Sequence, residues 1–422
     1  MTDIQAAKQY LFRATAYCDA IIERGEGSFV WDIHDKKYLD LNAGQFCLCF
    51  GHNYEPFNDL IAKQLRKIHH TNTATITPEF FEAAEAMASI NSFCLTKTMF
   101  LSTGSEANEA ALRYAKFYTK KNGVLSIDKG YHGLTLASQG ATMGGLWAFP
   151  QVPMTYTVPT PDYIHSDKSI SESDFLHNCI VQLEECICSH EAEIGAMIME
   201  PVIGVGGMVQ IPFEYLKAAR KLCAEHNILL IFDECQCGFA RSGSWFVYQQ
   251  AEAVPDILVT AKAMGAGFAV SAITMKKEIA EEIELELTHF SSHQNDPLSA
   301  SIVSFVINEI KRLDLLESNL TQGKYLLSAI RALCDEADAL VNPRGIGLMT
   351  AFDIGDDKIA DYRRFSALFQ RELECNGVLI QAVRQGRTFR VMPNYLITEA
   401  EIDFFKEACI KAYKKAFDAM RI

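Results

Sequence analysis

The stretch Ile228-Leu229-Leu230-Ile231-Phe232-Asp233-Glu234-Cys235-Gln236 decides the fold class of this chain. An unbroken apolar run that ends in acid, thiol and amide groups is typical of a strand buried on both faces of a sheet. A second apolar run, residues 255–260, leads into Ala261 and Lys262. The two runs therefore place an acid, Asp233, at one strand end and an amine, Lys262, just beyond another.

Helical and strand patterns alternate along the middle of the chain, beginning at about residue 78. We expect strands over 97–101, 124–127, 194–199 and 228–232, and helices over 78–90, 106–120, 213–226 and 297–312. Alternation of this kind predicts an α/β fold with a mostly parallel sheet and helices on both of its faces.

The two ends of the chain follow a different pattern. Residues 1–25 carry a helical pattern that ends at a pair of glycines, and two short strands follow. From about residue 315 we expect two helices, then a strand over 344–352 and a closing helix over 399–419. The segment 144–175 is rich in Pro, Thr and Tyr, and it predicts a long, ordered surface excursion of the kind that often serves a site.

Composition limits the classes of partner. The chain has 422 residues and is 49% hydrophobic, which is enough for two or three domains. Its net charge of −14 argues against non-specific binding to nucleic acid or to an anionic membrane, because both need a positive field. No apolar run reaches the ~18 residues of a membrane-spanning helix. We therefore expect small-molecule substrates, and neither a nucleic-acid nor a membrane partner.

Cysteine usage predicts a reducing compartment. The 13 cysteines are odd in number, and the start of the sequence lacks the basic and apolar regions of a signal peptide. Reduced thiols and a cytoplasmic location are expected. The pairs Cys47/Cys49 and Cys235/Cys237 are separated by a single residue, which fits no zinc ribbon, so no metal site is predicted.

The acid and the amine suit a pyridine aldehyde. Asp233 could keep a ring nitrogen protonated while Lys262 forms a Schiff base with the aldehyde, which is the equipment for pyridoxal phosphate (PLP), a cofactor that serves as an electron sink. A buried carboxylate is costly unless it is paired, and a structural arginine is the alternative partner. Gln236 could donate to the phenolic oxygen, and Cys235 is small enough to pack against the ring. The alternative for Lys262 is a solvated surface lysine.

Two further segments could complete such a site. Gly104 and Ser105 follow a strand and open a helix, whose free N–H groups and partial positive charge suit a phosphate. The alternative is an ordinary serine N-cap. Tyr131 follows another strand, and its ring could stack on a flat cofactor or lie in the core beside a turn glycine.

Together and in this order, these segments resemble the class III PLP-dependent aminotransferases, from about residue 20 to the C-terminus. The matched signatures lie at 104–109, 131–133, 200–201, 233–243, 255–267 and 296–298. The resemblance implies the PLP-dependent transferase fold of the aspartate aminotransferase type (fold type I), with a large, mostly parallel-sheet domain and a smaller α+β domain. We expect the large domain over 51–300, and the small domain from 1–50 and 301–422.

The resemblance also implies a role for each matched residue. Lys262 would form the Schiff base and move the substrate proton, and Asp233 would pair with the ring nitrogen. The implied cofactor-binding residues are Gly104, Ser105, Tyr131, His132, Glu200, Asp233, Cys235, Gln236, Lys262 and Ser292. Ser292 stands where relatives have a threonine that binds the phosphate of the partner subunit, so the resemblance implies a homodimer.

Substrate binding is implied near the C-terminus. Arg390 matches the family arginine that grips a substrate carboxylate, where a guanidinium fork suits the geometry; a structural salt bridge is the alternative. Arg387 is a weaker candidate for a second anion. Ala240, Ala261 and Asn295 depart from the family pattern, but none of them removes a group that the chemistry must have.

The favoured function is transfer of an amino group from an amino acid or amine to a 2-oxo acid or aldehyde. Gln45 and the stretch 292–298 also resemble the 2,2-dialkylglycine decarboxylase branch, where a glutamine contacts the scissile carboxylate; an unremarkable loop amide is the alternative for Gln45. An amino-acid racemase or epimerase is a third option within the family. A nucleotide-binding module is disfavoured, because the chain has neither a Gly-x-Gly-x-x-Gly after a first strand nor a P-loop motif.

Overall fold

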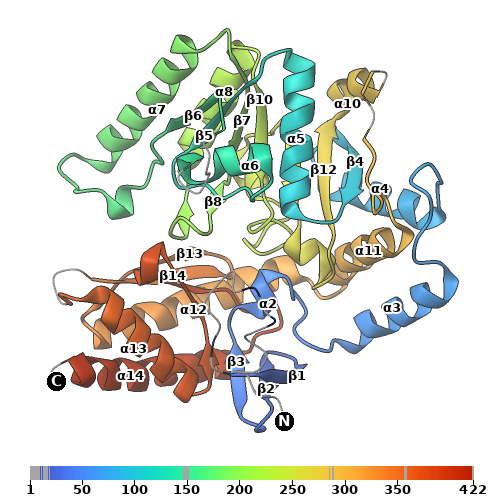
Figure 1. The fold of residues 1–422 in the computed structure, drawn as a ribbon. Helices are drawn as coiled ribbons and strands as arrows, with labels where there is room; N and C mark the ends of the chain where they lie inside the picture. The colour runs from blue at the N-terminus through green and yellow to red at the C-terminus, as the bar shows by residue number, and fades with distance from the viewer. Residues whose placement is uncertain are drawn as a thin grey trace.

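The computed structural model describes residues 10, 12, 18, 20–145, 152–284, 286–287, 289–355 and 359–420. Figure 1 shows a larger part built on a seven-stranded sheet and a smaller part below it, built from both ends of the chain. Most of the helix expected over 1–25 lies outside the described residues. Its last residues form a strand instead, β1 (Ile22–Glu26), because Gly27 turns the chain back at φ +54° to pair with β2 (Phe29–Asp32).

The seven-stranded sheet has the order β4-β12-β11-β10-β7-β5-β6. All neighbours from β11 to β6 are parallel, and β12 is antiparallel to both of its neighbours. The strands are β4 (Leu95–Leu101), β5 (Gly123–Ile127), β6 (Thr155–Val158), β7 (Ile194–Met199), β10 (Leu229–Asp233), β11 (Ile257–Thr260) and β12 (Ser271–Lys276). The predicted mostly parallel sheet is confirmed.

Strand β10 shows why the central strands are apolar at every position. Leu229 and Ile231 belong to a buried cluster with α5 (Gly104–Thr119) on one face, whereas Leu230 and Phe232 belong to a second cluster with α7 (Glu172–Ser189) and α8 (Phe213–Glu225). Successive side chains of a strand point to opposite faces. Because helices cover both faces, neither set of positions can be polar.

The larger part contains further helices, and the first of them lies away from the sheet (Figure 1). They are α3 (Glu55–Lys67), α4 (Pro78–Ile90), α6 (Leu136–Ala141), α9 (Val247–Ala251), α10 (Lys277–Glu284) and α11 (Pro297–Arg312). The bounds of α4 and α11 are those expected from the sequence. Both helices begin at a proline, whose fixed φ suits the first helical turn.

The smaller part contains two four-stranded sheets. One has the order β1-β2-β3-β15, with β3 (Lys37–Asp40) and β15 (Val378–Leu379) in parallel, so the two ends of the chain share a sheet. The other has the order β13-β14-β17-β16, with β16 (Gln381–Val383) and β17 (Thr388–Val391) forming a hairpin. Helices α12 (Leu315–Glu336), α13 (Tyr362–Cys375) and α14 (Glu399–Met420) complete this part.

Two predictions for this part are wrong. A single helix, α12, precedes the strands, where two helices were expected. The strand expected over 344–352 is an antiparallel hairpin of β13 (Leu340–Ile346) and β14 (Met349–Ile354). Gly347 makes the turn at φ +52°, a conformation that glycine adopts at little cost.

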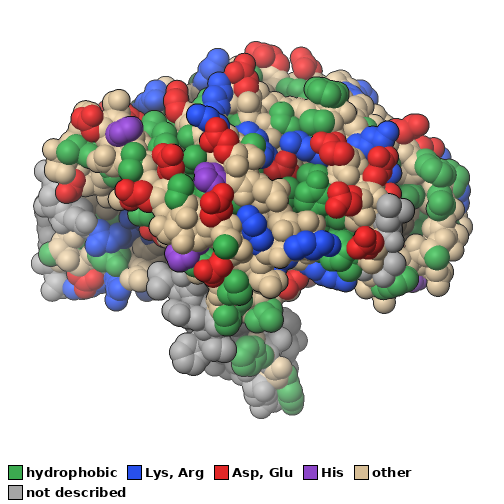
Figure 2. Space-filling model, turned by 90° about the horizontal axis from the view of Figure 1, so that it is seen from above, with side chains coloured by type: hydrophobic (Ala, Val, Ile, Leu, Met, Phe, Trp, Pro, Cys, Tyr) green, Lys and Arg blue, Asp and Glu red, His purple; other side chains and the backbone are tan. Residues whose placement is uncertain are grey.

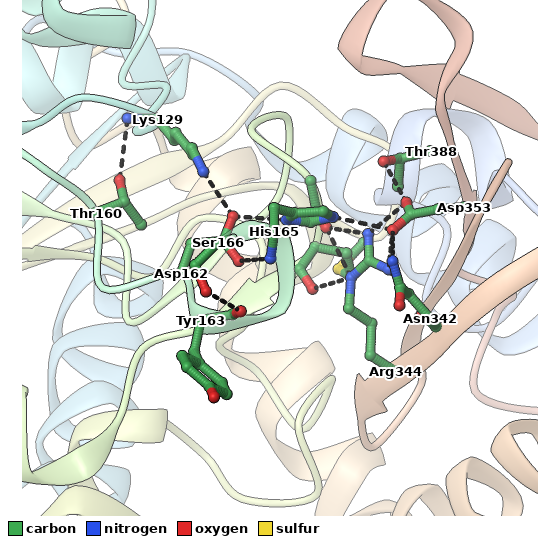
Figure 3. A network of polar contacts seen from close by, with 12 residues as sticks. Lys129, Thr160, Asp162, Tyr163, His165, Ser166, Asn342, Arg344, Asp353 and Thr388 are labelled. Atoms are coloured by element: carbon green, nitrogen blue, oxygen red, sulfur yellow. Dashed lines mark hydrogen bonds and ion pairs between the residues drawn. The ribbon is translucent and has the colours of Figure 1, made fainter. Parts of the chain in front are cut away.

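A polar network joins the two parts across the segment expected as a surface excursion (Figure 3). His165 contacts Asp162 at 2.6 Å through Nδ1 and Asp353 of β14 at 2.9 Å through Nε2. Lys129 contacts the same Asp162 at 2.6 Å, and Arg344 of β13 contacts Asp353 at 2.8 Å through two nitrogens. Residues 146–151 of the excursion lie outside the described residues, and its later part supplies the edge strand β6.

None of the described helices combines the length and the apolar character that crossing a bilayer would need.

Candidate active site

Two adjoining cavities lie where the two parts of the molecule meet. The smaller has a volume of about 250 Å³ and the larger about 760 Å³. Tyr131, Gln236 and Lys262 line both of them, so the two form one continuous site. The volume of the larger cavity is in the range of small-molecule sites, roughly 300–1,000 Å³.

The carboxyl ends of parallel strands deliver the side chains of the smaller cavity. Strand β4 leads to Gly104, β5 to Tyr131, β7 to Glu200, β10 to Asp233 and β11 to Lys262. In open α/β sheets, ligands bind outside these strand ends. The sheet topology thereby brings together residues that lie far apart in the sequence.

Asp233 is 3% exposed and is held by hydrogen-bond donors on both of its oxygens. Its Oδ2 contacts His132 Nδ1 at 2.9 Å and accepts from Asn108 Nδ2 at 2.7 Å, and its Oδ1 accepts from the Cys235 N–H at 3.1 Å. Burial alone would raise the pKa of this carboxyl group, but the hydrogen bond and charge of His132, with a smaller contribution from Lys262, lower it below its usual range. Asp233 therefore stays ionised while buried.

Asn108 is a site residue that the sequence analysis did not single out. Its Nδ2 donates to Asp233 and also to the His132 carbonyl oxygen at 2.8 Å, so it ties α5 to β10 and to the 131–133 loop. The signal lies in the pattern: Asn108 is 1% exposed on the buried side of α5, which is made mostly of alanines together with Leu112 and Tyr114. A buried amide among alanines needs a polar partner.

Glu200 and Gln236 form a second polar pair in the wall of the smaller cavity. Glu200 accepts from the Tyr131 N–H at 2.8 Å, the Gly204 N–H at 3.2 Å and Gln236 Nε2 at 3.1 Å. Burial and the nearby charge of Asp233 raise the pKa of Glu200 to about 7. Glu200 thus positions both Tyr131 and Gln236. The Oε1 atom of Gln236 has no hydrogen-bond partner among the described residues.

Lys262 adopts a conformation that is strained for a non-glycine residue. It begins a short 3-10 turn (Lys262–Gly265) with φ +52°. Such a left-handed residue costs about 1–3 kcal/mol and tends to mark a functional position. The side chain lines both cavities, which contradicts the alternative of a solvated surface lysine.

The start of α5 faces the 131–133 loop closely. Thr103 is the N-cap, with its side chain accepting from Glu106 N–H at 3.3 Å, so Ser105 has no capping role and lines the smaller cavity. A Cβ on Gly133 would lie 2.1 Å from Ser105 Oγ, and one on Gly104 would lie 3.2 Å from Cys235 Sγ. Gly133, which also has φ +114°, is required where it stands, whereas a Cβ on Gly104 would be tight against Cys235.

The larger cavity contains a buried arginine without a counter-ion among the described residues. Arg390 is 2% exposed, and its Nη2 donates to Gln381 Oε1, whereas Nε and Nη1 have no hydrogen-bond partner in the described part of the chain. Its Cζ lies 4.5 Å from the centre of the Phe46 ring. The structural salt bridge considered for Arg390 is therefore not formed with any described acid, and the unpaired N–H groups suit an anion.

Gln45 and Arg387 line the same larger cavity. Gln45 belongs to a left-handed turn, Ala43–Phe46, in which all four residues have positive φ, and Asp40 holds the turn by accepting from the N–H groups of Asn42 and Gly44. Arg387 packs over the Tyr362 ring at 3.9 Å. Ser292 is exposed and lines neither cavity of its own chain.

Comparison with known proteins identifies the family. A model of the class III aminotransferases matches residues 12–413. The chain belongs to this family. An acetylornithine aminotransferase of Archaeoglobus fulgidus is 30% identical over 400 residues, covering 95% of this chain and 97% of the relative. A leucine/methionine racemase of Thermococcus litoralis is 29% identical over 401 residues, covering 92% and 89%.

Solved structures give the same family. An amine transaminase from an uncultivated Pseudomonas species, solved with PLP bound, has a TM-score of 0.89 and 26% identity over 96% of this chain and 98% of its own. The fold is that of the fold type I transferases, and this class III aminotransferase is a PLP-dependent transaminase.

The residues of the smaller cavity fit PLP. The ionised Asp233 at its floor suits a protonated ring nitrogen, and the start of α5 suits a phosphate. The Gln236 Nε2 donates one hydrogen to Glu200 and has a second hydrogen for an acceptor in the cavity, and Lys262 supplies the amine. The small Cys235 side chain, opposite Gly104, leaves room for a flat ring.

We expect Asn108→Ala to weaken PLP affinity on the order of 10-fold. A hydrogen bond to a charged group contributes about 1.5–3 kcal/mol, and only the part of this free energy that is specific to the PLP-bound enzyme lowers the affinity. Equilibrium titration of the apoenzyme with PLP measures this effect. Asn319→Ala is the matched control, since Asn319 is equally buried and donates to the Ala240 carbonyl oxygen away from the cavity. Equal losses of PLP affinity in both variants would show that Asn108 acts only through general stability.

Proposed function

We propose that Lys262 and Asp233 are the catalytic residues of this transaminase. The observation that carries the proposal is their arrangement on one small cavity, with Asp233 buried and ionised at its floor and Lys262 in its wall. PLP, when bound, supplies an electron sink for the charge that develops at the substrate Cα. Lys262 would hold the cofactor covalently and then act as the general base that moves the Cα proton, a contribution worth roughly 10²–10⁴-fold.

The other residues of the smaller cavity would bind and orient the cofactor. Tyr131 and Cys235 would contact the two faces of the ring, and Gln236 would donate to the phenolic oxygen through the Nε2 hydrogen that Glu200 does not take. His132 and Glu200 would act as positioning residues, because His132 contacts Asp233 and Glu200 accepts from Gln236 and from the Tyr131 backbone. Gly104 and Ser105 would bind the phosphate at the start of α5.

Substrate would bind in the larger cavity with its carboxylate on Arg390. The support is that two guanidinium nitrogens beside the Phe46 ring have no hydrogen-bond partner among the described residues. An amino acid held in this way would present its Cα toward Lys262, which lines both cavities. The donor is accordingly an amino acid, and the acceptor a 2-oxo acid that uses the same arginine.

The proposed function includes a homodimer. Ser292 is exposed and lies outside its own chain's cavities, and a hydroxyl group there can serve the phosphate of a second subunit. Light scattering should give a dimer, and Ser292→Ala should weaken PLP affinity several-fold, as expected for one hydrogen bond of about 1 kcal/mol, with Ser292→Thr restoring it. A monomer that retains PLP fully would contradict this assignment.

A cytoplasmic location is also proposed. It is supported by the absence of any disulfide among the 13 cysteines, all of which the structure describes as free. Thiols remain reduced in that compartment. Recovery of the native protein with intact disulfides would argue against it.

Decarboxylation-dependent transamination is the second candidate, and its support is that Gln45 lines the cavity of Arg390. Wild-type enzyme should transfer the amino group of an ordinary amino acid without releasing carbon dioxide. Release of carbon dioxide from 2-aminoisobutyrate, and its loss in Gln45→Ala, would instead establish the decarboxylase. Conversion of one enantiomer of the donor into the other would establish a racemase, as the Thermococcus litoralis relative is named.

Replacement of Lys262 tests the main proposal. Borohydride reduction should fix PLP on the peptide that contains Lys262 in wild type, and Lys262→Ala should lose PLP on dialysis and lose activity by at least about 10²-fold. The control is Lys217→Ala, an exposed lysine paired with Glu252. If PLP is still fixed covalently in Lys262→Ala, another residue holds the cofactor.

A further inference from the structure

The larger cavity is positively charged in a chain whose net charge is −14. The described residues that line it include no Asp or Glu, and its cations are Lys262, Arg384, Arg387 and Arg390. The outer face in Figure 2, in contrast, mixes acidic and basic side chains. A cleft lined by one sign of charge favours ligands of the opposite sign. The cavity therefore favours anionic ligands, and its lining carries more positive charge than one substrate carboxylate would neutralise.

We propose that Arg384 binds a second carboxylate, at the side-chain end of the substrate, so that this transaminase acts on dicarboxylic amino acids or 2-oxo acids. The inference deepens the proposed function and rests on it, because Arg390 is taken to bind the carboxylate next to the reacting carbon. Arg387 adds positive charge to the same wall of the cavity.

The spacing of the two arginines suits the two ends of one short molecule. Arg390 pairs with Gln381 across the β16–β17 hairpin, and Arg384 follows Val383 at the end of the same hairpin. Three residues of strand separate these levels, which is about 10 Å at ~3.3 Å per residue. The backbone positions of the two arginines are therefore well separated, and both side chains would have to bend toward each other to bind the same carboxylate. Each guanidinium group can instead bind one end of a dicarboxylate.

The Arg384 side chain is held in place by the backbone of the other part of the molecule. A Cβ on Gly207 would lie 2.8 Å from Arg384 Cδ, so the arginine stem lies across this glycine. Arg384 also adopts φ +52° and Gln385 φ +57° in the turn, a conformation that is unfavourable for residues other than glycine. The contact with Gly207 and the fixed turn limit where the Arg384 side chain can lie, and in this position Arg384 lines the larger cavity.

No described acid neutralises Arg384. It makes no side-chain hydrogen bond or ion pair with the described residues, although Asp353 and Asp162 lie near enough to influence its charge. Both are already engaged (Figure 3): Asp353 accepts from Arg344, Thr388 and Asn342 and contacts His165, and Asp162 is bound by Lys129 and His165.

The consequence is a partly desolvated guanidinium that has no ion-pair partner among the residues described. Burial lowers the pKa of Arg384, with Asp353 and Asp162 opposing this effect and Arg344 and Arg387 adding to it. Removing a charge from water is unfavourable unless a partner of opposite charge replaces the water. A carboxylate that arrives with the substrate supplies this partner, and the guanidinium fork can bind it through two nitrogens.

Binding of unreactive acids to the PLP-loaded enzyme tests the inference directly. Isothermal titration should show that glutarate binds more tightly than pentanoate, which has the same chain length and one carboxylate. Arg384→Gln should weaken glutarate binding about 10-fold or more, as expected for the loss of a charge-assisted pair, and should leave pentanoate binding unchanged. The KM for 2-oxoglutarate should rise in the same proportion relative to the KM for 2-oxopentanoate, which has the same chain length and one carboxylate.

Two variants control the comparison. Arg364→Gln removes the same charge from an exposed position on α13 that lines neither cavity, and it should change neither Kd. Arg384→Lys keeps the charge and should retain part of the preference for glutarate. Equal binding of glutarate and pentanoate by wild type, or equal weakening of both by Arg384→Gln, would overturn the inference. Loss of all 2-oxo acid turnover with the glutarate preference intact would instead refute the proposed reaction.

Discussion

The buried carboxylate of Asp233 is the constraint on which the rest of the active site depends. An ionised carboxyl group in an apolar sheet is stable only when donors surround it, because otherwise it would take up a proton. The donors come from α5 (Asn108), from the loop after β5 (His132) and from the Asp233–Cys235 turn itself. Keeping this one group charged therefore fixes the relative positions of three segments.

The same positions create the phosphate end of the site. Asn108 lies one turn into α5, so its contact with Asp233 sets how far the start of that helix stands from the floor of the cavity. Its second contact, with the His132 carbonyl oxygen, draws the 131–133 loop against Ser105, where only a glycine fits at position 133. The acid and the helix start are thus parts of one rigid arrangement rather than two independent binding groups.

The sequence predicted the central sheet and most residues at its strand ends, because continuous apolar runs and the polar residues that follow them are local signals. It failed where contacts join distant segments. Asn108 resembles any polar helix residue until Asp233 is placed beside it, and Arg384 resembles a solvated turn residue until Gly207 is placed beneath it. The turn at Gly347 was missed because an apolar stretch interrupted by glycines reads equally well as one strand.

Backbone strain and charge together divide the site into two environments. Gln45, Lys262 and Arg384, from three separate turns, all have positive φ and all line the larger cavity. Below them, the smaller cavity contains the acids Asp233 and Glu200. On the proposed assignment, the carboxylate of an amino acid is drawn to the arginine side, while Asp233 at the floor serves the ring nitrogen of the cofactor. Two of these turns hold the cations Lys262 and Arg384 in fixed positions, so part of the charge around the larger cavity is set before a substrate binds.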